Sequence, residues 1–179
     1  MGHGRHQPTL RELPYALSIA QNWALNTMDS IQIFGPNLHE VDKPEHLNTS
    51  SLVLFNRFFK PTSTEQELLF GISWADVRDV AEAHVAALEK EEAGDERIVV
   101  SAPAIPNQEF IEAAKRAAGP LGIKSVQIGI RNYAPARTTT AIRFSTAKMD
   151  RILGIKITSV DDSIRDTVAD FKERGWVPA

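Results

Sequence analysis

The sequence predicts an α/β fold, because short apolar runs rich in β-branched residues alternate with segments whose apolar residues recur at helical spacing. With 179 residues the chain is long enough for one domain with a substantial core. Its hydrophobic content of 42% and charged content of 24% are ordinary for a globular protein. We expect a flexible N-terminus over residues 1–12 and a single α/β domain over residues 13–179.

The composition argues against several classes of function. A net charge of −3 gives no electrostatic reason to expect a nucleic acid or a membrane surface as partner. The absence of cysteine rules out disulfides, thiol catalysis and thiolate metal sites. No apolar run is long enough to span a membrane, and the first residues lack the apolar core of a secretory leader, so we expect a cytoplasmic protein.

The first third of the chain predicts two helices separated by a strand. Residues 13–28 carry apolar side chains at helical spacing, and residues 31–34 form a short buried strand that ends in the turn Gly35-Pro36. The polar residues 48–50 are candidate caps for the second helix, which carries three phenylalanines and ends before Pro61.

The middle of the chain predicts a helix between two apolar segments. Residues 68–74 form an apolar run, and Asp76 or Asp79 can cap the helix that follows. The face of this helix expected to be buried carries Val80, His84, Ala87 and Leu88. Residues 97–101 are rich in β-branched side chains and make the clearest strand of the chain.

The last part of the chain predicts three helices and one weaker strand. Asn107 is the expected cap of the first helix, and residues 126–130 alternate like a half-exposed strand. After a polar connection, a short helix is stopped by Gly154. Residues 159–162 resemble a capping box, and the buried stripe of the final helix is expected to carry Val160, Ile164, Val168 and Phe171.

Four stretches, in this order along the chain, resemble the second half of the extended short-chain dehydrogenase/reductases of the NAD-dependent epimerase/dehydratase type. They are residues 33–36, residues 46–50, residues 76–84 with the strand behind them, and residues 145–154. The chain is similar to the dihydroflavonol and aldehyde (methylglyoxal) reductases of that family. The resemblance implies a partial Rossmann-type fold that lacks the N-terminal nucleotide-binding half and has a helical C-terminal substrate region. NADP or NAD would be the cofactor if the family's function is retained.

The family's cofactor and proton-transfer motifs are not found. The glycines at residues 2–4 follow no strand, and Gln7 takes the place of the third glycine of a dinucleotide-binding turn. The family's tyrosine is followed four residues later by lysine, but here Ile19 stands four residues after Tyr15, and Tyr133 lies far downstream. We therefore assign no catalytic or cofactor-binding residue, and expect no cofactor for this chain alone.

A substrate pocket is expected at the carboxyl end of the strand over residues 31–34, where open α/β sheets place their ligands. The candidate substrate-binding residues are Phe34, Gly35, Pro36, Asn37, Trp74 and Arg78. Several have a purely structural alternative: Phe34 and Trp74 would also fill a core, and Arg78 with Asp76 would also form a helix cap and a surface ion pair.

The histidines favour structural interpretations. His84 is expected to be a hydrogen-bonded core residue. His39 and His46, with acidic residues between them, favour a solvated loop over a metal site, and no metal ligand is assigned.

Three hypotheses about function remain open. The first is a reductase-family protein that supplies a pocket for a small-molecule substrate without independent hydride transfer. The second is a cofactor-independent isomerase or cyclase that uses the same pocket by positioning its substrate. The third is a non-catalytic oligomerisation or partner module, or a degenerate fragment, because the loss of the main sheet would leave edges and apolar faces unpaired. Phe55, Phe58 and Phe59 exceed the need of one buried face and would pack on a partner subunit or on the surface that the missing half would cover. The expected protein partner is a second copy of the chain or a related full-length subunit.

Overall fold

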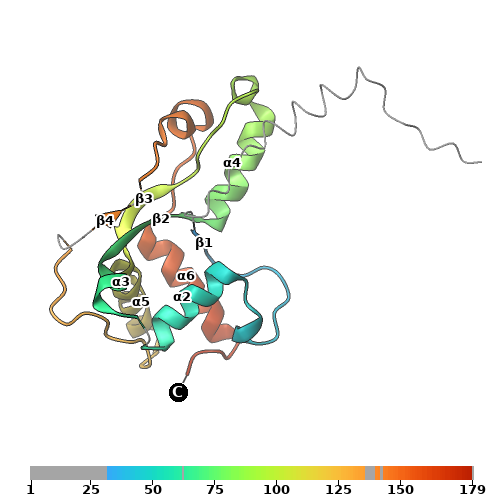
Figure 1. Ribbon diagram of the computed structural model, residues 1–179. Coiled ribbons are helices and arrows are strands. Elements are labelled where there is room, and N and C mark those ends of the chain that lie inside the picture. Colours follow the sequence, from blue (N-terminus) through green and yellow to red (C-terminus); the bar gives the residue numbers. More distant parts are fainter. Residues whose placement is uncertain (1–31, 62, 136–139, 142, 179) are drawn as a thin grey trace, which may run out of the picture.

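The computed structural model describes residues 32–61, 63–135, 140–141 and 143–178, which form a small mixed sheet with helices packed around it (Figure 1). The strands are β1 (Gln32–Phe34), β2 (Phe70–Asp76), β3 (Ala102–Pro106) and β4 (Thr140–Ala141). The longer helices are α2 (Thr49–Phe59), α3 (Glu65–Leu69), α4 (Val77–Glu89), α5 (Asn107–Leu121) and α6 (Val160–Glu173). Three short helical turns are η1 (Pro44–His46), η2 (Glu91–Ala93) and η3 (Met149–Leu153). The expected flexible N-terminus, the helix over residues 13–28 and Tyr15 lie outside the described residues.

β2 is the central strand of the sheet. β1 runs parallel to its second half, with Phe34 opposite Asp76, and β4 runs parallel to its beginning. β3 pairs with β2 in the antiparallel direction. Because β1 and β2 are parallel and in this register, their carboxyl ends meet at the same edge, where a ligand is expected in such sheets.

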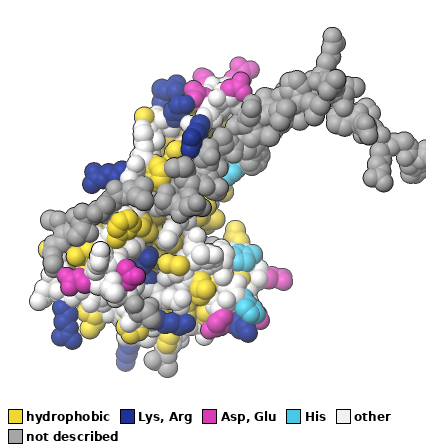
Figure 2. Space-filling model, viewed as in Figure 1, with side chains coloured by type: hydrophobic (Ala, Val, Ile, Leu, Met, Phe, Trp, Pro, Cys, Tyr) yellow, Lys and Arg dark blue, Asp and Glu magenta, His cyan; other side chains and the backbone are white. Residues whose placement is uncertain are grey.

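The core is divided between the two sides of the sheet. On one side α2, α5 and α6 gather beneath the strands (Figure 1), and their buried phenylalanines pack with those of the sheet in one cluster. On the other side α4 packs with η3 in a second, smaller cluster that includes Met149 and Leu153. Figure 2 shows acidic and basic side chains interspersed on the visible surface. None of the helices within the described ranges is long and apolar enough to cross a lipid bilayer.

Several expected elements are confirmed. The strand before Gly35 is present, and α2 begins after Asn48, whose side chain accepts a hydrogen bond from the Ser51 amide at 2.9 Å. α6 begins after Ser159, whose hydroxyl accepts a hydrogen bond from the Asp162 amide at 3.1 Å. The fully buried side chains of its stripe are Ile164, Val168 and Phe171. Gly154, in the left-handed conformation at φ +63°, ends η3 as expected.

Two expected strands are wrong. Residues 97–101 form no strand, and β3 begins only at Ala102. Ile98 and Val100 are nevertheless buried, because they pack into the cluster between α4 and η3. Residues 126–130 also form no strand, although the Gln127 amide donates to the Phe58 carbonyl oxygen at 2.9 Å. In both segments the apolar pattern reflects packing against helices and not strand pairing.

Two details of the helices also differ from expectation. Asn107 is the first residue of α5 and not its cap, and its side-chain amide donates to the Glu67 carbonyl oxygen at 2.8 Å. On α4 the buried positions are Asp79, Ala83 and Ala86, whereas Leu88 is 62% exposed. The buried face is therefore rotated toward the small residues, because the helix lies close to the second cluster.

The aromatic side chains of α2 are covered by this chain itself. Phe55 and Phe58 are buried, and Phe55 meets Phe171 of α6 edge to face, with the ring centroids 5.3 Å apart. Phe59 is partly buried and contacts Phe55 at a centroid distance of 5.0 Å. Phe55 and Phe58 are therefore covered within this chain, and the expected protein partner stays a prediction.

Candidate functional site

A cavity of about 600 Å³ lies where β1 and β2 end together. Its walls come from the segment that leaves β1 and from the first turn of α2, and are completed by the beginning of α4. The lining residues are residues 33–39, residues 48–51 and Val77. Phe34, Gly35, Pro36 and Asn37, four of the six candidate substrate-binding residues, are thus brought to one cavity.

Gly35 allows the chain to turn tightly against α4. Its φ of +132° is one that side chains with a Cβ rarely adopt, and a Cβ at this position would stand 2.6 Å from Cγ1 of Val77. Glycine is therefore required on two grounds, backbone conformation and close contact. The turn is held against the first residue of α4, which fixes the wall of the cavity.

Asn37 is committed to structural hydrogen bonds. Its backbone amide and its side-chain Nδ2 both donate to Oδ2 of Asp170 in α6, at 3.2 and 3.3 Å, and its Oδ1 accepts from the Ser51 hydroxyl at 3.1 Å. Its carbonyl oxygen accepts from the guanidinium of Arg174, which is itself paired with Asp170 at 2.7 Å. Asn37 therefore ties the loop to α2 and α6 more than it offers free groups to a ligand.

Phe34 and Trp74 lie under the cavity floor. Both are almost completely buried, at 1% and 2% exposure, and their rings are stacked with centroids 6.3 Å apart. Phe110 of α5 meets Phe34 edge to face at a centroid distance of 5.1 Å. Phe34 contributes to the lining, whereas Trp74 is outside it and supports Phe34 from the core.

Arg78 is engaged in an ion-pair network and is not among the residues that line this cavity. Its Nε and Nη2 donate to the two carboxylate oxygens of Asp76 at 2.8 and 2.9 Å, and its Nη1 donates to Asp166 of α6 at 2.6 Å. Burial of Asp76 by itself raises its pKa, but the hydrogen bonds and charge of Arg78, together with Ser163, outweigh burial and hold the pKa of Asp76 below its ordinary value. The pair caps α4 and joins it to α6, and substrate binding by Trp74 or Arg78 stays a prediction.

The candidate set omitted the opposite wall of the cavity. Leu38 is 94% exposed at its mouth, and Thr49 and Ser50 bring hydroxyl groups from the first turn of α2. His39 also belongs to the lining. The sequence predicted residues 48–50 only as helix caps. Their position in a stretch that resembles the reductases was the signal that they could also line the pocket.

Three further titratable side chains in the described part of the chain have structural partners or a pKa shift that disfavours proton donation. Burial raises the pKa of the Tyr133 hydroxyl, and the neighbouring Glu109 carboxylate raises it further, which is the opposite of what a proton donor needs at neutral pH. His84 Nδ1 lies 2.6 Å from the Val80 carbonyl oxygen, and His46 Nδ1 lies 2.7 Å from Asp42. Among the residues that the structure describes, no group of three acidic or histidine side chains could hold a metal ion.

No protein-family model matches the chain. Over 148 residues it is 28% identical to the NADPH-dependent methylglyoxal reductase GRE2 of Saccharomyces cerevisiae, covering 82% of this chain and 42% of that protein. The structure of the yeast methylglyoxal/isovaleraldehyde reductase Gre2 complexed with NADPH matches 80% of this chain and 42% of its own, with a TM-score of 0.63 and 25% identity. This chain is a homologue of the Gre2-type reductases.

Two further matches cover a similar part of the chain. A putative oxidoreductase of Saccharomyces cerevisiae is 30% identical over 156 residues, covering 84% of this chain and 43% of that protein. The Bordetella bronchiseptica enzyme WbmH, solved with NAD⁺, shares only the fold, with 19% identity over 81% of this chain and 44% of its own, at a TM-score of 0.51. The chain spans less than half the length of the curated relatives it matches. The family resemblance and the α/β fold related to Rossmann-type short-chain reductases are confirmed.

Proposed function

We propose that this chain forms the substrate-binding wall of a Gre2-type reductase and holds a small aldehyde or ketone in the cavity beside Phe34 and Gly35. The observation that supports this most is the cavity of about 600 Å³ at the joint carboxyl ends of β1 and β2. The yeast reductase Gre2 is named for methylglyoxal and isovaleraldehyde, which are small carbonyl compounds that a space of this volume accommodates.

The lining of this cavity combines apolar and hydroxyl groups. Leu38 and Pro36 offer an apolar surface for the carbon chain of the substrate. Thr49 and Ser50 can donate hydrogen bonds to a carbonyl oxygen, and they stand at the N-terminus of α2, where the helix dipole favours a developing negative charge. The chain's own contribution would be to bind and orient the substrate and to exclude water.

The cofactor that the family implies is NADP(H), which would supply the hydride. The apolar wall at Phe34 and Pro36 fits a substrate or a nicotinamide ring. The tight turn at Gly35 does not fit a pyrophosphate, because Val77 already occupies the space above its α-carbon, and the described part of the chain offers no other glycine-rich turn at the start of a helix. We therefore propose that the chain alone does not transfer hydride, and that the dinucleotide is gripped by other residues, such as those of a related full-length subunit.

A binding experiment with a matched pair of variants tests the proposal. Isovaleraldehyde is titrated into the 179-residue chain and into the variant Ser50→Phe, and binding is followed by NMR chemical shifts. The phenyl ring fills the cavity beside Thr49, so we expect the affinity to fall by about tenfold or more. Ser145→Phe introduces the same ring at an exposed position outside the cavity and should leave the affinity unchanged.

Equal affinity in the two variants, or no saturable binding by the wild-type chain, contradicts the proposal. NADPH is titrated in parallel. Tight binding of NADPH by the chain alone would contradict the proposal that other residues bind the dinucleotide, and would favour an independent reductase. Turnover of a carbonyl substrate without any nucleotide would instead favour the isomerase or cyclase hypothesis.

A further inference from the structure

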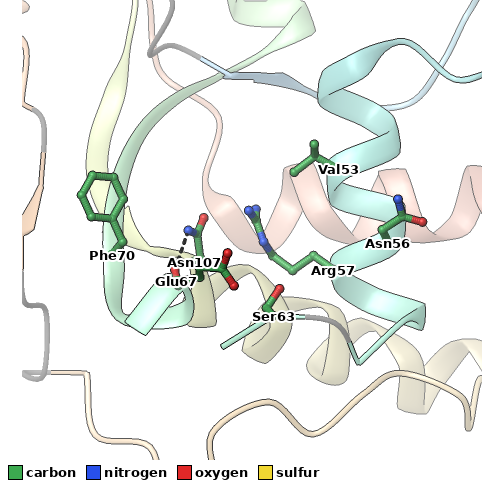
Figure 3. Close-up of a pocket in the computed structure, with 7 residues that line it drawn as sticks. All are labelled: Val53, Asn56, Arg57, Ser63, Glu67, Phe70 and Asn107. Carbon is green, nitrogen blue, oxygen red and sulfur yellow. Dashed lines mark hydrogen bonds between the residues drawn. The ribbon is translucent and has the colours of Figure 1, made fainter. Parts of the chain in front are cut away.

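A second cavity, of about 400 Å³, lies on the other half of α2 and has no lining residue in common with the first. It opens to the surface and is lined by residues of α2, by Ser63 and Glu67 before and within α3, by the first residue of β2 and by the first residue of α5. Figure 3 shows the side chains that surround it. Those that carry the argument are Val53, Arg57, Ser63, Glu67, Phe70 and Asn107.

Arg57 brings a positive charge into this cavity. Its side chain extends from α2 toward Glu67 and Asn107, whereas the neighbouring Asn56 turns away (Figure 3). Its Nη1 is buried and, within the described ranges, has no hydrogen-bond partner. Burial lowers the pKa of Arg57 to about 10, so that the guanidinium is still charged at neutral pH. A buried guanidinium nitrogen without an acceptor is unfavourable, so Nη1 would be satisfied by an anionic or carbonyl oxygen.

Asn107 places a free acceptor in the same space. Its Nδ2 donates to the Glu67 carbonyl oxygen at 2.8 Å, which fixes the orientation of the amide group. Its Oδ1 is buried and lacks a partner among the described residues. The cavity thus combines an unsatisfied donor and an unsatisfied acceptor, with the Ser63 side chain and the apolar Phe70 completing its wall.

Glu67 limits the charge that a ligand can carry. Its carboxylate accepts from the Thr64 backbone amide at 2.7 Å and from the Thr64 hydroxyl at 3.0 Å, and these hydrogen bonds lower the pKa of Glu67. It therefore stays ionised beside Arg57, yet within the described part of the chain no ion pair closes between the two. A dianion would be repelled by this carboxylate more strongly than a singly charged group.

We propose that this second cavity binds the carboxylate of a small organic acid, with Arg57 donating to the carboxylate and Asn107 Oδ1 accepting a hydrogen bond from a hydroxyl or amide group of the same ligand. Phe70 and Val53 provide apolar walls for its carbon skeleton. The proposal does not depend on the reductase function proposed above, because the two cavities are separate.

The test uses benzoate as the probe, with uncharged benzamide and dianionic phenyl phosphate as matched comparisons, titrated into the full chain at constant ionic strength. Isothermal titration calorimetry and NMR chemical shifts report the binding. We expect benzoate to bind with a Kd of about 1 mM, and both comparison compounds to bind about tenfold more weakly. Arg57→Leu should reduce benzoate binding by about tenfold or more, whereas the same substitution at the exposed Arg131 should have no effect.

Glu67→Gln provides a test that misfolding cannot imitate, because it should increase binding. Glutamine can also complete a capping box with Thr64, so α3 should be retained while the negative charge is removed. We expect benzoate to bind about threefold more tightly to this variant, and phenyl phosphate to gain by a larger factor. Equal binding of benzoate and benzamide, retained binding in Arg57→Leu, or no saturable binding of benzoate up to about 10 mM would each overturn the proposal.

Discussion

The two cavities on either half of α2 differ in how their polar groups are satisfied. In the cavity at the end of β1, Asn37 uses its backbone amide, both polar atoms of its side chain and its carbonyl oxygen in contacts with α2 and α6. In the cavity beside Arg57, a guanidinium nitrogen and an amide oxygen are buried and have no partner within the described residues. The polar groups of Asn37 hold the wall of the first cavity in place, whereas the unpaired groups of Arg57 and Asn107 are available to a ligand.

This difference separates two uses of buried polarity. A satisfied network adds to stability and shape, and removing one member leaves the others unpaired. An unsatisfied group detracts from stability until a ligand arrives, so its removal should cost binding more than it costs folding. Substitutions in the two regions should therefore affect the free energy of unfolding very differently, and the three predictions below test that contrast.

The largest effect is expected for Gly35→Ala at the first cavity. The added methyl group would meet Val77 at 2.6 Å, and the backbone would hold alanine at a φ of +132°. We expect the free energy of unfolding in urea to fall by about 3 kcal/mol, from steric overlap and backbone strain together. Gly122→Ala is the control, because its φ is +68° but open space surrounds the position, and it should lose only about 1 kcal/mol. Similar losses at both positions would show that the close contact with α4 is unimportant.

The sequence predicted best those features that depend on neighbouring residues. The caps at Asn48 and Ser159 and the stop at Gly154 were found because each is a local hydrogen-bonding or backbone requirement. The helix α3 was missed although Thr64 and Glu67 have the spacing of a capping box, so this signal was present.

Strand pairing was predicted less well because it depends on distant segments. Residues 97–101 have the composition of a strand, but β2 pairs instead with the segment that begins at Ala102, and two of the five residues there are prolines. Prolines cannot donate to a strand ladder, so the composition of β3 itself does not indicate a strand. Ile98 and Val100 are buried against η3, so their apolar pattern correctly indicated burial although it did not indicate a strand.

Only part of the candidate site was predicted, again because the rest depends on contacts between distant segments. Phe34 to Asn37 are consecutive residues at the end of a strand and in the turn after it, so their presence in one cavity follows from the strand and the turn. The Arg57 cavity needs α2, α3 and α5 to meet, and in the sequence it shows only as an arginine on an aromatic helix. Asn107, which supplies the unsatisfied acceptor of the same cavity, was interpreted from the sequence as a helix cap. Capping is the ordinary role of asparagine before an apolar segment.

A smaller effect, and one that depends on pH, is expected for Asp76→Asn. The pKa of Asp76 is lower in the folded chain than in the unfolded chain, so its stabilising contribution is complete above the unfolded pKa and is lost as the pH falls through the folded pKa. We expect the variant to lose about 2 kcal/mol of unfolding free energy at pH 7, because it breaks a bidentate pair with Arg78. The difference from wild type should shrink in urea titrations as the pH falls below the ordinary aspartate pKa of about 4.

The control for this prediction is Asp161→Asn, which removes an exposed ion pair with Arg116 and should cost less than about 0.5 kcal/mol at pH 7. A difference between wild type and Asp76→Asn that stays constant from neutral to acid pH would contradict the prediction. It would mean that the buried carboxylate contributes through its shape and not through its charge.

The smallest effect is expected for Arg57→Leu at the second cavity. Leucine removes a buried nitrogen that has no partner among the described residues, but it also removes the contact between the guanidinium and the Phe110 ring at 5.9 Å. Relief of the buried charge should at least offset the lost cation–π contact of about 0.5–1 kcal/mol, so we expect the free energy of unfolding to be unchanged or higher by up to about 1 kcal/mol. A loss of about 2 kcal/mol or more in urea unfolding would instead show that the guanidinium is satisfied within the chain, and the contrast between the two cavities would disappear. Benzoate at saturating concentration should raise the stability of the wild-type chain and leave that of the variant unchanged, because only a ligand that binds the folded state shifts the unfolding equilibrium.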